Sequence, residues 1–348
     1  MEEKADTLWV DVRTPSEYAE AHVPGAVNLP LFSDDERALV GTTYVQKSRE
    51  EAIKLGLDLV GPGLGTLVRE AERLLGSPSE APSLMLYCAR GGMRSRSVAW
   101  LLSLYGWRVR TLDGGFKAYK HRLGEYLSRG IPFVVLAGPT GAGKTDLLHL
   151  LREMGHQTLD LEELARHRGS AFGYLPGAVQ PSGEMLRCLL ISELEKFDLS
   201  RPVFTESESL KIGRVSLPEE LFRTLGESDV IVVDTPREVR TRRIVSLYGT
   251  LDRDFLSQSF AKISKRIGGL NLSLAEDALQ KGDLTAATEI ALDYYDKAYA
   301  RSCETLYKGR VLGHVTSQTG DLHEMVHEIV RILGTSSLSG EENRSNKP

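Results

Sequence analysis

The chain has 348 residues, of which 26% are charged, with a formal net charge of −5 and a pI near 6.0. Its length allows two domains of ordinary size, each able to bury its own core. The charge balance excludes a globally basic nucleic-acid-binding protein, so contacts with a nucleic acid would need local clusters of Lys and Arg. No apolar run approaches the roughly 20 residues that span a bilayer, and no membrane association is expected.

The cysteines argue against a disulfide scaffold. There are three, an odd number spread far apart: Cys88, Cys188 and Cys303. The N-terminus MEEKADTLWV lacks the apolar segment of a secretory signal. We therefore expect a cytoplasmic protein with reduced thiols.

Residues 1–130 alternate short apolar runs with segments of helical spacing, which predicts a small α/β domain. The predicted strands are 8–13, 84–88 and 109–112, and the predicted helices are 95–106 and 116–127. A mostly polar segment between 32 and 60 has helical spacing and predicts an insertion that lies over the sheet.

Residues 131–334 form a second series of strands and helices. Its predicted strands are 133–137, 158–161, 203–206, 229–234 and 310–315. Helical stretches separate them, as in a parallel sheet with helices on both faces. A largely helical block at about 252–307 interrupts the series, and the polar composition of 335–348 predicts a disordered tail.

Cys88 follows a predicted strand and begins the loop CARGGMRS (88–95). Gly91 and Gly92 let backbone N–H groups face one point, the next helix contributes its positive N-terminus, and Arg90 and Arg94 add full charges. Such surroundings lower a cysteine pKa from about 8.5 into a range of roughly 3.5–7.5. We therefore predict that Cys88 is a nucleophile and that the loop binds an anionic donor. An inert core cysteine is the alternative.

The segment GPTGAGKT (138–145) fits the phosphate-binding pattern GxxxxGK[ST] and lies between a predicted strand and a predicted helix. Its glycines would let backbone N–H groups face a polyphosphate, its lysine would bridge the charge, and its threonine could hold Mg²⁺. The predicted polyphosphate-binding residues are Gly138, Gly141, Gly143, Lys144 and Thr145. The pattern specifies a polyphosphate and not adenosine.

Three carboxylates stand at comparable strand ends, and any one of them could lie on the metal side of this site: Asp160, Glu206 and Asp234. Arg240 and Arg243, in PREVRTRRI (236–244), are candidate phosphate or RNA contacts, and a solvated helix face is the other interpretation. The eight histidines show no metal-ligand spacing, so no structural metal site is predicted.

Three ordered motifs in the first domain resemble the rhodanese family: VDVRTPSEYAEAHVPGAVNLP (10–30), CARGGMRS (88–95) and LDGGFKAY (112–119). This resemblance implies that Cys88 takes up sulfur or selenium, with the loop amides, Arg90 and Arg94 holding the donor. It also implies a buried structural role for Asp11 and Arg13. The spacing of Cys88 and Arg94 is similar to that of cysteine-dependent phosphatases as well, and the loop alone does not exclude them.

Further stretches resemble the tRNA 2-selenouridine synthase family, notably ERALVGTTYVQ (36–46), DLEELARHRGSAFG (160–173) and ESESLKIGRVSLP (206–218). The resemblance implies a rhodanese-like α/β domain followed by a P-loop NTPase-like parallel-sheet α/β domain with a helical insertion. It adds Arg166, His167 and Arg168 as candidate tRNA or phosphate contacts, with a solvated helix end as the alternative.

The family resemblance implies that selenium replaces sulfur in a 2-thiouridine at the wobble position of tRNA. The implied steps are S-geranylation by geranyl diphosphate and then selenation by selenophosphate through Cys88, with no tightly bound cofactor. The P-loop would hold the diphosphate of the geranyl donor. The alternatives are a sulfurtransferase fused to an ATP-dependent kinase-like domain, or a non-catalytic sulfur-carrier and RNA-binding adaptor.

Overall fold

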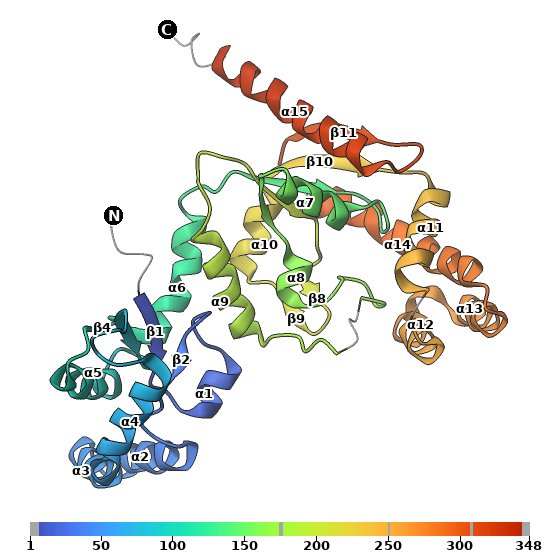
Figure 1. Cartoon of the computed structure of the whole chain (residues 1–348). Helices are drawn as coiled ribbons and strands as arrows, with labels where there is room; N and C mark the ends of the chain where they lie inside the picture. Colours follow the sequence, from blue (N-terminus) through green and yellow to red (C-terminus); the bar gives the residue numbers. More distant parts are fainter. Residues whose placement is uncertain (1–6, 174–176, 250, 307–308, 343–348) are drawn as a thin grey trace. The chain divides into compact units, whose positions relative to one another are not determined.

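A computed structural model describes residues 7–173, 177–249, 251–306 and 309–342. The contacts within the chain divide it into two compact units (Figure 1). Unit 1 comprises residues 1–126 and 182–195, and unit 2 comprises residues 127–181 and 196–348. The chain first passes from unit 1 to unit 2 after residue 126, close to the domain boundary that the sequence predicts near residue 130. The sequence places the segment 182–195 in the second domain, whereas the structure groups it with the first.

Unit 1 contains a parallel sheet of four strands in the order β2-β1-β3-β4. The strands are β1 (Thr7–Asp11), β2 (Val27–Asn28), β3 (Ser83–Tyr87) and β4 (Val109–Thr111). Neighbouring β1 and β3 end together, with Asp11 opposite Tyr87. This register brings Cys88, the residue after β3, beside the residues that follow β1.

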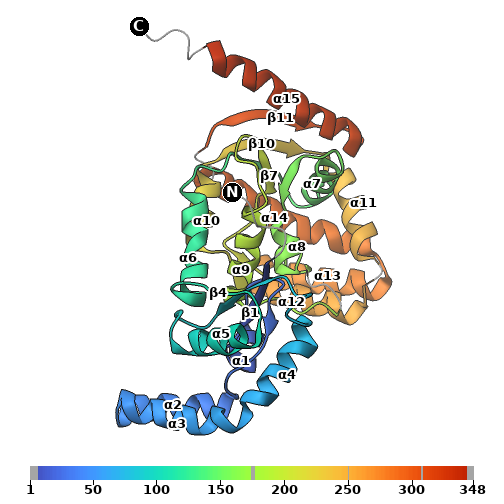
Figure 2. The ribbon, with the colours of Figure 1, turned by 60° about the vertical axis from the view of Figure 1, so that its left-hand side comes forward.

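The helices of unit 1 are α1 (Pro15–Glu20), α2 (Asp34–Gln46), α3 (Arg49–Val60), α4 (Leu64–Leu75), α5 (Met93–Tyr105), α6 (Gly115–Leu127) and α9 (Gly183–Leu194). A short 3₁₀ turn, Gly61–Gly63, joins α3 to α4. The predicted helical insertion is α2 and α3, which lie alongside each other (Figure 2). Their main contacts are mutual, rather than with the sheet as expected, because α2 buries no side chain and α3 buries only Ala52.

Helix α9 belongs to unit 1 through polar contacts with α6. Arg122 donates to Glu195 over 3.0 Å, Tyr126 donates to the same carboxylate over 2.9 Å, and Lys120 is paired with Glu184. These partners are more than 60 residues apart in the chain, so the grouping could not be read from local sequence.

Unit 2 contains a parallel sheet of five strands in the order β11-β10-β5-β7-β6. The strands are β5 (Phe133–Ala137), β6 (Gln157–Leu159), β7 (Val203–Glu206), β10 (Asp229–Asp234) and β11 (Val311–Thr316). This confirms the predicted parallel α/β fold. The central strand β5 is buried along its whole length and lies between β7 and β10, where the strand order changes direction. Ligands of such sheets bind at the carboxyl ends of the strands at this point.

The helices of unit 2 are α7 (Lys144–Glu153), α8 (Leu161–Ala165), α10 (Glu219–Gly226), α11 (Arg237–Tyr248), α12 (Arg253–Ile267), α13 (Gly269–Lys281), α14 (Leu284–Leu306) and α15 (Leu322–Glu342). A two-stranded antiparallel ribbon pairs β8 (Lys211–Ile212) with β9 (Val215–Ser216). Helices α12, α13 and α14 form the predicted helical block and pack together beside α11 (Figures 1 and 2).

Helix α15 extends into the segment 335–348, for which the composition predicts disorder. The helix reaches Glu342, and residues 343–348 lie outside the described residues. Its N-terminal part packs Met325, Val326 and Ile329 into the core, and an established helix adds residues at little cost because each forms one more hydrogen bond. Among the described residues, no helix has both the length and the apolar composition needed to cross a membrane.

Candidate functional site

The Cys88 sulfur lies at the base of the loop between β3 and α5. The side chain is 3% exposed, and Sγ lies 3.3 Å from Ser95 Oγ and 3.3 Å from the backbone nitrogen of Gly92. Burial acts to raise the pKa of the Cys88 thiol, but hydrogen bonds from the Ser95 hydroxyl and from the N–H groups of Ser95, Arg90 and Gly92 outweigh it and lower the pKa. The loop therefore favours a thiolate.

Two glycines allow this loop to pack against the turn before α6. Gly91 has φ +64°, and a β-carbon there would lie 2.7 Å from the Leu112 carbonyl oxygen. A β-carbon on Gly115 would collide with the Cys88 carbonyl oxygen. The Phe116 N–H donates to that same oxygen over 2.8 Å. The motif LDGGF is thus the support against which the Cys88 loop is held.

The two loop arginines differ in their surroundings. Arg90 is exposed at the loop, whereas Arg94 is 15% exposed and its Nη1 lies 2.7 Å from Glu17 Oε2. Burial acts to raise the pKa of Glu17, and Arg94 more than compensates, so the pKa is lowered. An anionic donor at Arg94 would have to compete with this carboxylate.

Asp11 and Arg13 form a buried ion pair, with 2.6 Å between Arg13 Nη2 and Asp11 Oδ2. The guanidinium also donates to the Ala21 carbonyl over 2.6 Å and lies 3.9 Å from the centre of the Phe116 ring. These contacts tie the end of β1 to α1 and α6, as expected of structural polar residues.

Replacement of Ser95 by alanine is expected to raise the pKa of Cys88. The hydroxyl is one of several groups that stabilise the thiolate, and one such hydrogen bond contributes about 0.5–1.5 kcal/mol. The measurement is the rate of iodoacetamide alkylation of the Cys88 peptide against pH, followed by mass spectrometry. The midpoint should move to higher pH.

Ser97→Ala is the matched control for this experiment, because Ser97 lies on the same helix and is exposed. Its alkylation midpoint should equal that of the unchanged protein. Equal midpoints in the Ser95 and Ser97 variants would show that the Ser95 hydroxyl does not stabilise the thiolate.

The predicted phosphate-binding loop joins β5 to α7 in unit 2. Gly143 has φ +95° at the start of α7, a conformation that favours glycine. Lys144 Nζ donates to the Gly138 carbonyl over 2.8 Å and is 3.4 Å from the Pro139 carbonyl oxygen. Thr145 Oγ1 donates to Glu162 Oε2 over 3.2 Å. The structure therefore brings together the residues predicted to bind a polyphosphate.

Arg240 and Arg243 hold this loop from α11. Arg240 is 7% exposed, pairs with Asp296 over 2.8 Å and donates to the Thr140 carbonyl over 3.3 Å. Arg243 donates to the Gly141 carbonyl over 3.0 Å. Neither arginine lies on a solvated helix face, which was the alternative to a phosphate or RNA contact. Arg240 is also too deeply buried to contact RNA. Helical spacing alone could not show this, because the loop lies about 100 residues away.

Three glutamates surround the Lys144 ammonium group, and the sequence predicted only one of them. Burial lowers the pKa of Lys144, against the opposing effect of Glu208, Glu162 and Glu206. Burial and the neighbouring Glu208 raise the pKa of Glu162 to about 8. Glu206 is fully buried, its Oε1 accepts the N–H groups at the start of α8, and burial raises its pKa. Within the described residues, its Oε2 has no hydrogen-bond partner.

The sequence held a signal for one of the missed glutamates. Glu208 stands two residues after Glu206, and alternate residues of extended chain point to the same side. The other two predicted carboxylates lie in different surroundings. Asp160 caps α8 by accepting the Glu163 N–H over 2.8 Å and is 2.9 Å from His149 Nε2, while Asp234 is exposed at the end of β10.

The segment HRGSAFG (167–173) lines the site instead of presenting a basic surface. His167 is 8% exposed, and burial lowers its pKa, so its position does not suit a contact with tRNA phosphate. Arg166 ends α8 with φ 51° and lies 3.5 Å from the Val179 carbonyl oxygen, and Arg168 is partly buried. A β-carbon on Gly169 would lie 2.7 Å from Glu208 Oε2. The burial follows from the chain turning inward after α8.

Comparisons with known proteins cover both units. A family model described as the tRNA 2-selenouridine synthase AAA domain matches residues 131–329, and the rhodanese-like domain matches residues 1–122. A solved structure of shikimate kinase from Acinetobacter baumannii is 15% identical and covers 64% of this chain and 99% of its own, with a TM-score of 0.32.

Among curated proteins, the tRNA 2-selenouridine synthase of Nitrosomonas europaea is 40% identical over 249 residues, 70% of this chain and 64% of that protein. The match therefore spans just under two thirds of that relative. The synthase of Bdellovibrio bacteriovorus is 35% identical over 354 residues, 86% of this chain and 91% of that protein. By the match to more than half of its residues and by these identities, the chain belongs to the tRNA 2-selenouridine synthase family.

Proposed function

We propose that this protein replaces the sulfur of 2-thiouridine at the tRNA wobble position with selenium, in two steps that use its two sites. The observation that carries the proposal is a thiolate-stabilising loop at Cys88 in the same chain as a phosphate-binding loop at Lys144. The first suits transfer of a chalcogen, and the second suits a diphosphate leaving group.

In the first step, the thiouridine sulfur attacks C1 of geranyl diphosphate. The C1–O bond breaks, diphosphate leaves, and the base loses its N3 proton. The loop N–H groups around Gly141 and Gly143, together with Lys144, are suited to hold the departing diphosphate and to stabilise its charge.

In the second step, selenium bonds to C2 of the activated base and the C2–S bond breaks. Geranyl thiol leaves, and the P–Se bond of selenophosphate is cleaved with water to release phosphate. The exchange is redox-neutral overall. S-alkylation is needed because a thiocarbonyl sulfur is a poor leaving group, whereas a thiol leaves readily. The Cys88 thiolate attacks the phosphorus of selenophosphate, so that an S–P bond forms, the P–Se bond breaks and selenide is released to attack C2. Water then cleaves the S–P bond, which releases phosphate and regenerates the thiol. The N–H groups of Arg90 and Gly92 hold the anionic donor.

Mg²⁺ fits the phosphate-binding site as a partner of the diphosphate. Its preferred ligands are oxygens, and it is usually bound through one or two protein groups plus phosphate oxygens and water. The Thr145 hydroxyl and the unpartnered Oε2 of Glu206 are suitable oxygens. No group of three metal-ligating side chains occurs among the residues described, so the diphosphate would supply the remaining ligands. The ion would neutralise charge on the leaving group.

The test is mass spectrometry of tRNA nucleosides after incubation of the full chain with 2-thiouridine-containing tRNA. With geranyl diphosphate alone, S-geranyl-2-thiouridine should form, and addition of selenophosphate should convert it to 2-selenouridine. Absence of any modified nucleoside would favour the sulfur-carrier and RNA-binding adaptor. A requirement for ATP in place of geranyl diphosphate would favour the kinase-like alternative.

A further inference from the structure

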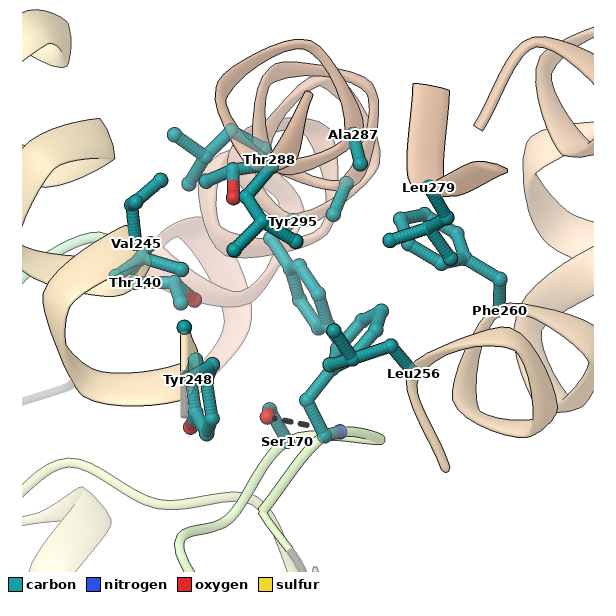
Figure 3. Close-up of a pocket in the computed structure, with 16 residues that line it drawn as sticks. Thr140, Ser170, Val245, Tyr248, Leu256, Phe260, Leu279, Ala287, Thr288 and Tyr295 are labelled. Carbon is teal, nitrogen blue, oxygen red and sulfur yellow. Dashed lines mark hydrogen bonds between the residues drawn. The ribbon is translucent and has the colours of Figure 1, made fainter. Parts of the chain in front are cut away.

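An apolar pocket lies beside the phosphate-binding loop in unit 2. Its cavity volume is about 50 Å³, within about 530 Å³ of space between the lining atoms that includes open solvent. Helices α11 to α14 and the segment HRGSAFG supply its lining, which includes Tyr248, Leu256, Phe260, Leu279 and Tyr295 (Figure 3). Protein interiors are close-packed, and a cavity lined by apolar side chains favours apolar groups as its occupants.

The pocket offers little to a polar ligand. Its lining is mostly aliphatic and aromatic, and two of its polar groups are already bonded within the protein. Ser170 Oγ accepts the Phe172 N–H over 3.1 Å, and the Tyr295 hydroxyl accepts the Ala171 N–H over 3.0 Å. A nucleobase needs several hydrogen-bond partners, whereas a hydrocarbon chain needs none.

The pocket is joined to the phosphate-binding loop through shared residues. Thr140 belongs to the loop and lines the pocket, and Ile244, also in the lining, lies where a β-carbon on Gly141 would meet it at 2.9 Å. Figure 3 shows Thr140 on one side of the pocket and Leu279 and Phe260 on the opposite side. A ligand with a diphosphate at one end and an apolar chain at the other would fit this arrangement.

We propose that this pocket holds the ten-carbon chain of geranyl diphosphate and that its far side, at Leu279 and Phe260, selects the chain length. The inference rests on the proposed geranylation and adds a separate site to it. Burial of one methylene changes affinity by about fourfold, so geranyl diphosphate should bind at least about 100-fold more tightly than inorganic diphosphate.

Two substitutions test the selection of chain length. Leu279→Ala enlarges the far side, and Ala287→Leu, on α14, fills part of the pocket. The readout is kcat/KM for prenylation of thiolated tRNA with dimethylallyl, geranyl and farnesyl diphosphates, which carry five, ten and fifteen carbons. Leu279→Ala should raise the farnesyl-to-geranyl ratio about tenfold. Ala287→Leu should lower the geranyl-to-dimethylallyl ratio about tenfold, since one misfitted carbon is worth roughly 10–200-fold.

The matched control is Leu274→Ala, the same change on the same helix at a side chain that is 49% exposed and outside the lining. Its ratios should equal those of the unchanged protein. A variant that only destabilised the fold would lower kcat/KM for all three donors together and leave their ratios unchanged. Unchanged ratios in both pocket variants would therefore overturn the inference, while the proposed geranylation itself would stand.

Binding measurements separate failure of this inference from failure of the proposed function. Absence of prenylation by the unchanged protein with every donor would count against the function alone. In that event, calorimetry with geranyl diphosphate and inorganic diphosphate decides the inference. Preferential binding of geranyl diphosphate with a negative heat-capacity change, reduced by Ala287→Leu, would support it. Equal affinities for the two ligands would overturn it.

Discussion

Replacement of Cys88 by serine is expected to abolish formation of 2-selenouridine while S-geranyl-2-thiouridine accumulates. The loop stabilises a thiolate through the Ser95 hydroxyl and the N–H groups of Arg90 and Gly92. A serine hydroxyl does not ionise near neutral pH, so the same contacts would hold an unreactive group. Nucleoside mass spectrometry with both donors present measures the two products.

Cys188→Ala is the control for this result. Cys188 is fully buried in α9, and burial raises the pKa of its thiol to about 12, so it has no reactive thiolate. The control should retain selenation. Undiminished selenation in the Cys88 variant would show that this cysteine takes no part in the reaction. Loss of geranylation together with selenation would indicate that the substitution disrupts the fold.

The second large effect is expected for Lys144→Ala, which should lower kcat/KM for geranylation by on the order of 100-fold. A hydrogen bond to a charged group is worth about 1.5–3 kcal/mol, and the substitution removes the ammonium group that lies near three glutamates at the loop. With the ammonium gone, the diphosphate would lose this charge-assisted hydrogen bond. Prenylated nucleoside formed against geranyl diphosphate concentration gives the constants.

Selenation of tRNA that is already S-geranylated should be unaffected in the same variant. Lys281→Ala serves as the control, because Lys281 is an exposed lysine that pairs with Asp277 on its own helix. Full geranylation by the Lys144 variant would exclude the phosphate-binding loop from the chemistry.

Local patterns predicted the fold well because the strands are short, apolar and bounded by turns. The segments 133–137 and 203–206, for example, coincide with β5 and β7. The same patterns predicted the placement of helices less well where contacts between distant parts of the chain determine it. Helix α9 joins α6 through partners more than 60 residues away, and α2 with α3 packs mainly as a hairpin.

The candidate site shows the same division. Cys88, Lys144 and the glycines of both loops could be named from sequence because each acts through its own neighbours in the chain. Arg240 could not be interpreted, since its role is to hold Thr140, 100 residues away.

The sequence by itself determined the family, the two loop motifs and the expected chemistry, because those depend on residue type and spacing. Only the tertiary structure decided which carboxylates lie near Lys144 and that an apolar pocket adjoins its loop. The electrostatic environment of a side chain and the space around it depend on the three-dimensional position of distant segments. Around the pocket, those segments are α11–α14 and HRGSAFG, and their positions are set by packing against one another. No local sequence pattern specifies this packing.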